Sequence, residues 1–96
     1  MGKLKLLCEI IDQKIKSEVD TQKYNEASEK MVLSVKEFVN FQTLKSLAQI
    51  KGIIDLEDSM YIYGALGEWD KQTLGTKICL TKLHADLLKA KMQGKL

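Results

Sequence analysis

No proline occurs among the 96 residues, and apolar residues recur at every third or fourth position along most of the chain. Proline lacks the backbone amide that a helix uses, and its ring clashes with the preceding turn. Apolar residues that recur every three to four positions share one face of an α-helix. Both features predict an all-α protein.

The length suits one modest hydrophobic core. The sequence contains no internal repeat, no low-complexity tract and no linker rich in proline, glycine and serine. We therefore expect residues 1–96 to form a single helical domain. Its expected fold is a compact bundle of four or five helices, built on an N-terminal antiparallel helical hairpin and a long C-terminal helix.

The apolar periodicity and the capping residues divide the chain into its expected helices. These helices span about residues 3–19, 23–40, 41–52, 56–66 and 71–92. Asp20 or Thr21 can cap the second helix, Asp55 the fourth and Asp70 the last. Residues 60–63, with the sequence Met-Tyr-Ile-Tyr, also have strand propensity, so this segment can be helix or strand.

The charged residues are unusual in kind and in distribution. All fifteen basic residues are lysine, and the net charge is only +2. Arginine, which reads guanine edges and grips phosphate with paired hydrogen bonds, is absent. This composition argues against a nucleic-acid partner and is typical of an AT-rich coding genome, such as that of a phage, a plasmid or a low-GC bacterium. Acids predominate in residues 52–69 and lysines in residues 70–96, so the two segments can attract each other within or between subunits.

The sequence also bears on where the protein works. No apolar run approaches the roughly 20 residues that span a bilayer, and no secretory signal is recognisable. We therefore expect a cytoplasmic protein without membrane contact. Cys8 and Cys79 are far apart in the sequence, and in a reducing cytosol each is expected to be a buried free thiol.

The expected last helix is apolar on two opposite faces, whereas a surface helix needs only one apolar face. One face carries Leu74, Ile78, Ala85, Leu88 and Met92. The opposite face carries Cys79, Leu80, Leu83, Leu87 and Ala90. Such a helix is either the centre of the bundle, or its second face meets another molecule. We expect the second alternative, with Cys79, Leu80, Leu83, Leu87 and Ala90 as the interface.

This interface predicts a small non-enzymatic protein that acts by interaction or regulation, as an accessory or inhibitor protein does. Its expected partner is a second copy, giving a homo-oligomer, or another protein. The sequence contains few of the residues and motifs that enzymes use for catalysis. His84 is the only histidine, no local pair of metal ligands surrounds it, and no nucleophile elbow or phosphate-binding loop occurs. We expect no catalytic residues and no cofactor.

Two acidic pairs support an alternative function. Glu26 and Glu29 lie three residues apart, as do Asp55 and Asp58, so each pair shares one face of a helix. Carboxylates from two facing helices can hold Mg²⁺. The arrangement resembles the ExxE…ExxD pattern of the all-α, MazG-like nucleotide pyrophosphohydrolases. The resemblance implies that these four residues bind magnesium and that the protein hydrolyses a nucleoside triphosphate.

A second alternative is a DNA-binding protein. Leu47 and Ala48, followed by Gly52 and Ile53, resemble the first helix and turn of a helix-turn-helix motif within residues 44–65. The recognition helix of such a motif would open with three carboxylates, which DNA phosphates repel.

Overall fold

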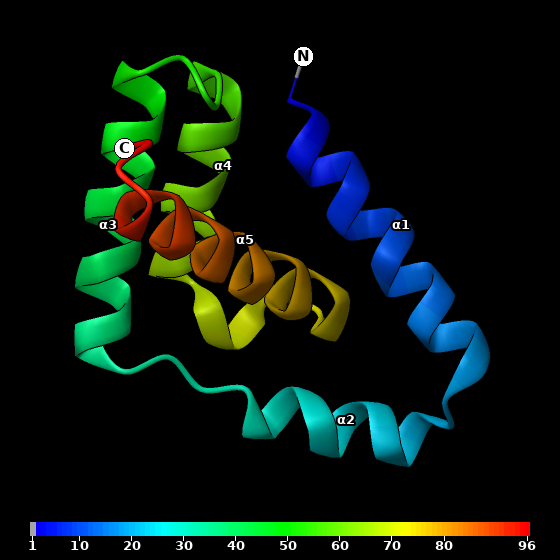
Figure 1. Ribbon diagram of the computed structural model, residues 1–96. Helices are drawn as coiled ribbons and strands as arrows, with labels where there is room; N and C mark the ends of the chain where they lie inside the picture. Colours follow the sequence, from blue (N-terminus) through cyan, green and yellow to red (C-terminus); the bar gives the residue numbers. More distant parts are fainter. Residues whose placement is uncertain (1) are drawn as a thin grey trace.

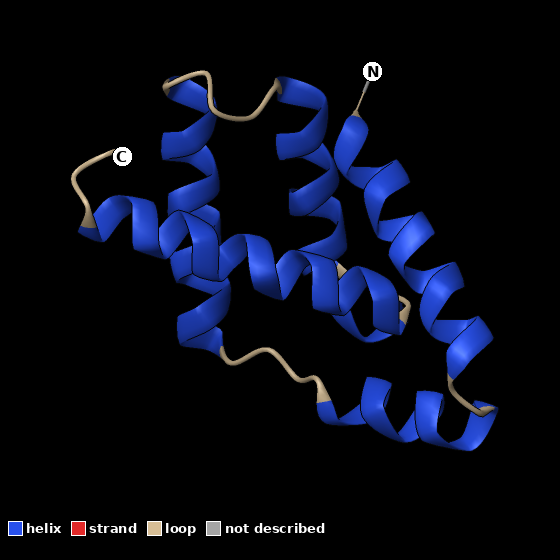
Figure 2. Cartoon of the chain, turned by 45° about the vertical axis from the view of Figure 1, so that its right-hand side comes forward, coloured by secondary structure: helices blue, strands red, loops and turns tan. Residues whose placement is uncertain are grey.

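A computed structural model describes residues 2–96, so Met1, the first residue of the expected domain, lies outside the described residues. These residues form α1 (Lys3–Glu18), α2 (Thr21–Lys30), α3 (Val35–Ile50), α4 (Leu56–Gly67), a short 3-10 helix η1 (Trp69–Lys71) and α5 (Leu74–Met92). No strand occurs in the described part of the chain (Figure 2). The all-α prediction is confirmed.

The last helix, α5, lies at the centre of the arrangement. It crosses the α3–α4 pair, and its N-terminal half packs against α1 (Figure 1). It also contacts α2, which runs along the lower edge of the molecule in that view. The core between these helices is led by Phe41, Ile62, Leu80 and Cys8, whose side chains are almost completely buried.

Side-chain caps fix where most of the helices begin. The carboxylate of Asp20 accepts a hydrogen bond from the Lys23 amide at the start of α2, and Asp55 accepts one from the Asp58 amide at the start of α4. Each bond satisfies a backbone donor that the first helical turn leaves free. Gly52 has a φ of +75°, which suits the chain reversal after α3.

The expected helix over residues 23–40 is wrong, because the chain leaves the helical path after Lys30. Ser34 and Glu37 form a capping box that starts α3 at Val35, and each side chain bonds the other residue's backbone amide. The Nε1 of Trp69 donates a hydrogen bond of 2.7 Å to the Met31 carbonyl oxygen, which ties the extended segment to the core. The expected third helix is therefore the second half of α3.

Two further expectations are decided in the C-terminal half. Residues 60–63 are helical and lie within α4. The last helix begins at Leu74, capped by Thr73, whereas the predicted cap Asp70 lies in η1.

The bundle is assembled differently at its two ends. α3 and α4 run antiparallel side by side, whereas α2 leaves α1 at a wide angle instead of returning along it (Figures 1 and 2). The N-terminal hairpin is therefore open, and the surface of α2 is shared between α1 and α5.

Candidate interaction surface

The structure assigns the predicted interface to the interior of the molecule. Leu80 is 0 % exposed, and Cys79 and Leu87 are also buried in the core. Leu83 packs against the same core, and Ala90 is half-buried. This prediction is wrong for the buried residues, because α1 and α3 cover the face of α5 that was expected to be free.

The opposite face of α5 is the one that remains open. Ile78, Leu88 and Met92 are exposed, and Ala85 is exposed between them. Leu74, at the start of the helix, is buried. α5 is thus apolar on two sides, as the sequence predicts. The side available to a partner, however, lies opposite the predicted interface.

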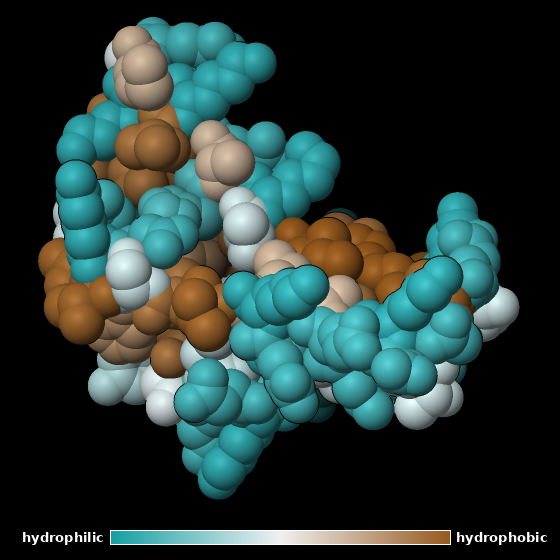
Figure 3. Space-filling model, turned by 90° about the horizontal axis from the view of Figure 1, so that it is seen from below, coloured by the Kyte–Doolittle hydropathy of each residue, from teal (hydrophilic) through white to brown (hydrophobic). Residues whose placement is uncertain are grey.

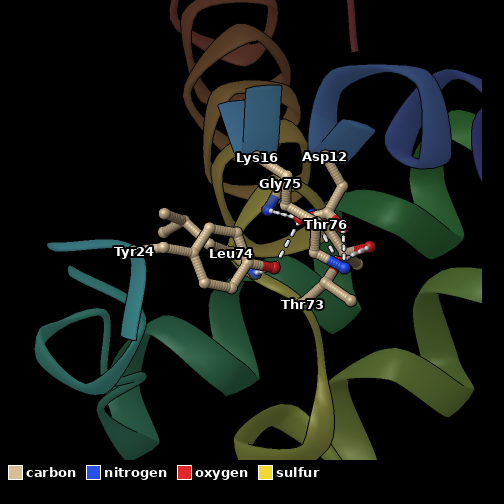
Figure 4. A network of polar contacts seen from close by, with 7 residues as sticks. All are labelled: Asp12, Lys16, Tyr24, Thr73, Leu74, Gly75 and Thr76. Atoms are coloured by element: carbon tan, nitrogen blue, oxygen red, sulfur yellow. Dashed lines mark hydrogen bonds and ion pairs between the residues drawn. The ribbon is translucent and has the colours of Figure 1, made fainter. Parts of the chain in front are cut away.

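A buried polar network holds the N-terminus of α5 (Figure 4). The Asp12 carboxylate of α1 accepts a hydrogen bond of 2.6 Å from the Tyr24 hydroxyl and one of 2.9 Å from the Gly75 amide. The same Tyr24 hydroxyl accepts a bond of 3.2 Å from the Leu74 amide. Lys16 completes the network with an ion pair of 3.3 Å to Asp12. Three helices therefore meet at one carboxylate.

The hydrogen bonds and charges of this network stabilise the ionised form of Asp12. Burial acts to raise the pKa of Asp12, but the hydrogen bonds from Tyr24 and Gly75 and the charge of Lys16 outweigh it, so the pKa is lowered. The carboxylate is therefore ionised at neutral pH. Its oxygens are already bonded to Tyr24, Gly75 and Lys16, so its role is to hold helices together.

A second cluster lies where α1, α4 and α5 meet. Cys8 and Cys79 are free buried thiols, as expected, and the side chains of Cys79 and Tyr61 are near that of Cys8. Burial raises the pKa of Cys8 to about 12. The nucleophile of cysteine chemistry is the thiolate, so Cys8 is held in its unreactive form.

The two acidic pairs are not brought together. Glu26 and Glu29 lie on α2, whereas Asp55 and Asp58 lie at the N-terminal end of α4, on the opposite side of the molecule (Figure 1). Asp58 accepts a hydrogen bond of 3.1 Å from the Leu4 amide, and so caps α1 from another helix. Within residues 2–96, no group of three or more histidine, cysteine and acidic residues could hold a metal ion.

His84 packs in the bundle. Its ring stacks on Phe41 at 4.9 Å between ring centroids, with an interplanar angle of 9°. Its Nε2 is buried and has no hydrogen-bond partner in the part of the chain that the structure describes. The contact with the Phe41 ring therefore accounts for the position of the His84 ring.

The helix-turn-helix alternative does not match the arrangement of α3 and α4. The helices of that motif cross at about 90–120°, whereas α3 and α4 lie antiparallel and side by side (Figures 1 and 2). The acidic first turn of α4 is also engaged in capping, through Asp55 and Asp58.

Large apolar side chains are exposed on several helices. Among the described residues they are Leu6, Leu7, Ile10, Val19, Val32, Val35, Val39, Ile50, Ile53, Leu56, Met60, Tyr63, Ile78, Leu88 and Met92. From below, the hydrophobic surface gathers on the left, where the lower end of α3 lies, and inside the hollow on the right (Figure 3). Large apolar patches of this kind mark interaction surfaces.

The apolar residues spread around the helix over residues 56–66 predict that it is largely buried. In the structure Leu56, Met60 and Tyr63 of α4 are exposed. The two glycines at positions 64 and 67 were the available signal, because glycine is a poor helix former and needs a packing reason inside a helix.

Comparison with known proteins identifies no relative: no family model, curated protein or solved structure matches this chain. Within residues 2–96, no helix has the length and apolar character required to cross a membrane.

Proposed function

We propose that this protein is a helical interaction module that associates with a second copy of itself by burying exposed apolar helical surface. It acts in an accessory or regulatory role. The sequence supports the class of function through the two-sided α5, and the burial pattern moves the contact from the face of Leu80 to faces that remain open.

The observation that carries the proposal is the size of the accessible surface. The chain exposes 6512 Å² for a mass of 10.9 kDa, whereas a monomeric globular protein of this mass exposes about 5,600 Å². The radius of gyration, 13.6 Å, likewise exceeds the value of about 12.5 Å for a compact domain of this length.

The excess accessible surface area is close to the area that each partner buries in a protein–protein interface. It amounts to roughly 900 Å², and each partner in a standard protein–protein interface buries about 800 Å². Large apolar side chains are exposed on several helices, and burial of such side chains is the main driving force of association. A second copy supplies the missing cover without requiring any further component.

Multi-angle light scattering over a wide concentration range tests the proposal. We expect the mass to rise from 10.9 kDa toward a multiple of it, with a midpoint at micromolar concentration. Association should also be accompanied by a negative heat-capacity change on dilution calorimetry, the signature of apolar burial. A constant monomer mass up to about 1 mM, near −4 kcal/mol of binding free energy, would contradict the proposal.

A further inference from the structure

One exposed stripe on α4 has the length and composition of a helix-packing surface. Leu56 is 59 % exposed, Met60 64 % and Tyr63 65 %, and the three lie at helical spacing on one side of α4. The opposite side of the same helix, led by Ile62 and Leu66, is buried in the core. No charged residue occurs between Asp58 and Glu68. The middle of α4 itself therefore contributes only uncharged side chains to this surface.

Two glycines lie along this stripe, although no packing within the chain requires a glycine at either position. A Cβ added at Gly64 or Gly67 would meet no atom within 4 Å. A Cβ at Gly75, by contrast, would overlap the backbone of Asp12. Glycine inside a helix costs up to about 1 kcal/mol relative to alanine. Packing within this chain justifies that cost at Gly75 and does not justify it at Gly64.

The glycines open a depression beside the exposed side chains. Its lining includes Phe38 and Gln42 of α3 and Met60, Tyr63, Gly64 and Gly67 of α4. The ammonium of Lys45 lies 5.1 Å from the centroid of the Tyr63 ring, a cation–π contact that helps to fix the ring. Bulky side chains and a hollow thus occur on the same face.

A face that carries both a protrusion and a hollow is self-complementary. In a two-fold dimer, residue i of one copy contacts residue j of the other, and residue j contacts residue i. If two α4 helices pack antiparallel, Met60 of each copy lies opposite Gly64 of the other, and Leu56 lies opposite Gly67. The large residues of one helix then fill the space left by the small residues of its neighbour.

We propose that a second copy of this chain docks on the outer face of α4, with the two α4 helices antiparallel about a two-fold axis. This inference rests on the proposed self-association and specifies where it occurs. Three side chains that are about two-thirds exposed provide a few hundred Å² per copy. Val39 is also exposed on α3, next to the Gln42 that lines the depression, and extends the contact toward the area of a standard interface.

The first test compares two exposed apolar residues on different helices. Met60→Glu places a charge in the middle of the proposed contact, and Leu88→Glu places one on the open face of α5. Light scattering should show at least a 100-fold weaker dimer for Met60→Glu and less than a three-fold change for Leu88→Glu. Circular dichroism and the fluorescence of the buried Trp69 verify that both variants are folded.

The outcomes separate this inference from the proposed function. If the unmodified protein is a monomer at every concentration, self-association and the α4 site both fail. If it associates and only Leu88→Glu disrupts the complex, self-association stands and the α4 site is wrong. Loss of association in both variants also contradicts a site confined to α4.

A second test uses Gly64→Ala. Alanine is the better helix former and has open space at this position, so the unfolding free energy of the monomer should rise by up to about 1 kcal/mol. The same methyl group fills the proposed hollow, so the dissociation constant should increase at least ten-fold. A variant that gains stability and still dimerises as tightly overturns the α4 packing.

A third test determines the direction of the helices. Met60→Cys and Gly64→Cys proteins are oxidised separately and as a mixture, at a protein concentration above the increased dissociation constant that a side chain at residue 64 causes. The oxidant is a low-molecular-weight disulfide such as oxidised glutathione, which accepts the two electrons as each thiol pair forms a disulfide. The antiparallel arrangement predicts a covalent dimer mainly in the mixture. Predominant Met60→Cys homodimers would indicate a parallel arrangement and contradict the proposal. The unmodified protein is the control, because its native cysteines are buried.

Discussion

Gly75 of α5 packs directly against the backbone of Asp12 in α1, and the Asp12 carboxylate accepts a hydrogen bond of 2.9 Å from the Gly75 amide. The close approach depends on the missing side chain, since a Cβ at residue 75 would occupy the space of the Asp12 Cα. One residue pair therefore combines a close backbone contact between α1 and α5 with a hydrogen bond to the first turn of the central helix.

Gly75→Ala should be severely destabilising. The added methyl group forces α1 and α5 apart, which costs about 3 kcal/mol or more, because backbone atoms cannot move aside as a flexible side chain can. Urea unfolding followed by Trp69 fluorescence measures the loss. Gly67→Ala is the matched control, compared at a protein concentration at which both variants are monomeric, and should change stability by less than about 1 kcal/mol. Equal effects of the two substitutions would contradict the close packing at Asp12.

Stability should fall in acid because of Asp12. Its pKa is lower in the folded protein than its ordinary value of 3.8, so the unfolded chain binds the proton more tightly. The stabilisation is therefore complete above about pH 4.5 and is lost as the pH falls through the folded pKa, with a slope of at most about 1.4 kcal/mol per pH unit for one proton. Urea midpoints between pH 2.5 and 7 measure this slope.

Asp12→Asn isolates the contribution of that carboxylate. The amide removes the charge that Lys16 and Tyr24 stabilise, so the variant should lose about 1–3 kcal/mol at pH 7. Its stability should then depend less on pH below 4.5. An unchanged acid profile would show that other carboxylates cause the acid sensitivity.

Alkaline pH should destabilise the fold through Cys8. Burial raises the pKa of its thiol from 9.0 to about 12, so the folded protein keeps a proton that the unfolded chain releases. The stabilisation is complete below pH 9 and is lost as the pH rises from 9 to 12, by at most about 1.4 kcal/mol per pH unit for one proton. Cys8→Ala should flatten this part of the profile while lowering stability at pH 7. Both free thiols should resist a thiol reagent until the protein unfolds.

Ser34→Ala tests the break between α2 and α3. The substitution removes the cap on the Glu37 amide and should cost about 1 kcal/mol. Ser17→Ala is a suitable control, because Ser17 is exposed and bonds only to the Lys14 carbonyl of its own helix. Unfolding monitored by Trp69 is appropriate, since its indole contacts Met31 beside the break. A loss no larger than that of Ser17→Ala would mean that tertiary contacts alone end α2.

Where local signals were unambiguous, sequence and structure agree. The stripe of Leu4, Cys8, Ile11 and Ile15 predicts α1 to within one residue, and Asp55 caps α4 as expected. The capping box at Ser34 and Glu37 is an equally local signal, but apolar spacing continues across it and predicts one unbroken helix. The capping box divides the expected helix over residues 23–40 at the position where α3 begins.

The candidate surface could be predicted less well than the helices. Periodicity predicts that α5 has two apolar faces, but it does not indicate whether Leu80 or Leu88 is the buried one. The crossing of α1 and α3 over one face decides that Leu80 is core and Leu88 is surface. The same limit applies to Glu29 and Asp55, whose separation in space depends on how α2 and α4 are placed.

The sequence by itself determined the helical class, the apolar faces and several caps, because these depend on interactions within three or four residues. Only the tertiary structure decided which apolar faces are covered, that Asp12 anchors α5, and that Gly75 is required where Gly64 is not. Those properties arise from contacts between residues far apart in the sequence, 63 positions in the case of Asp12 and Gly75, and no local spacing encodes which helix comes to lie against which.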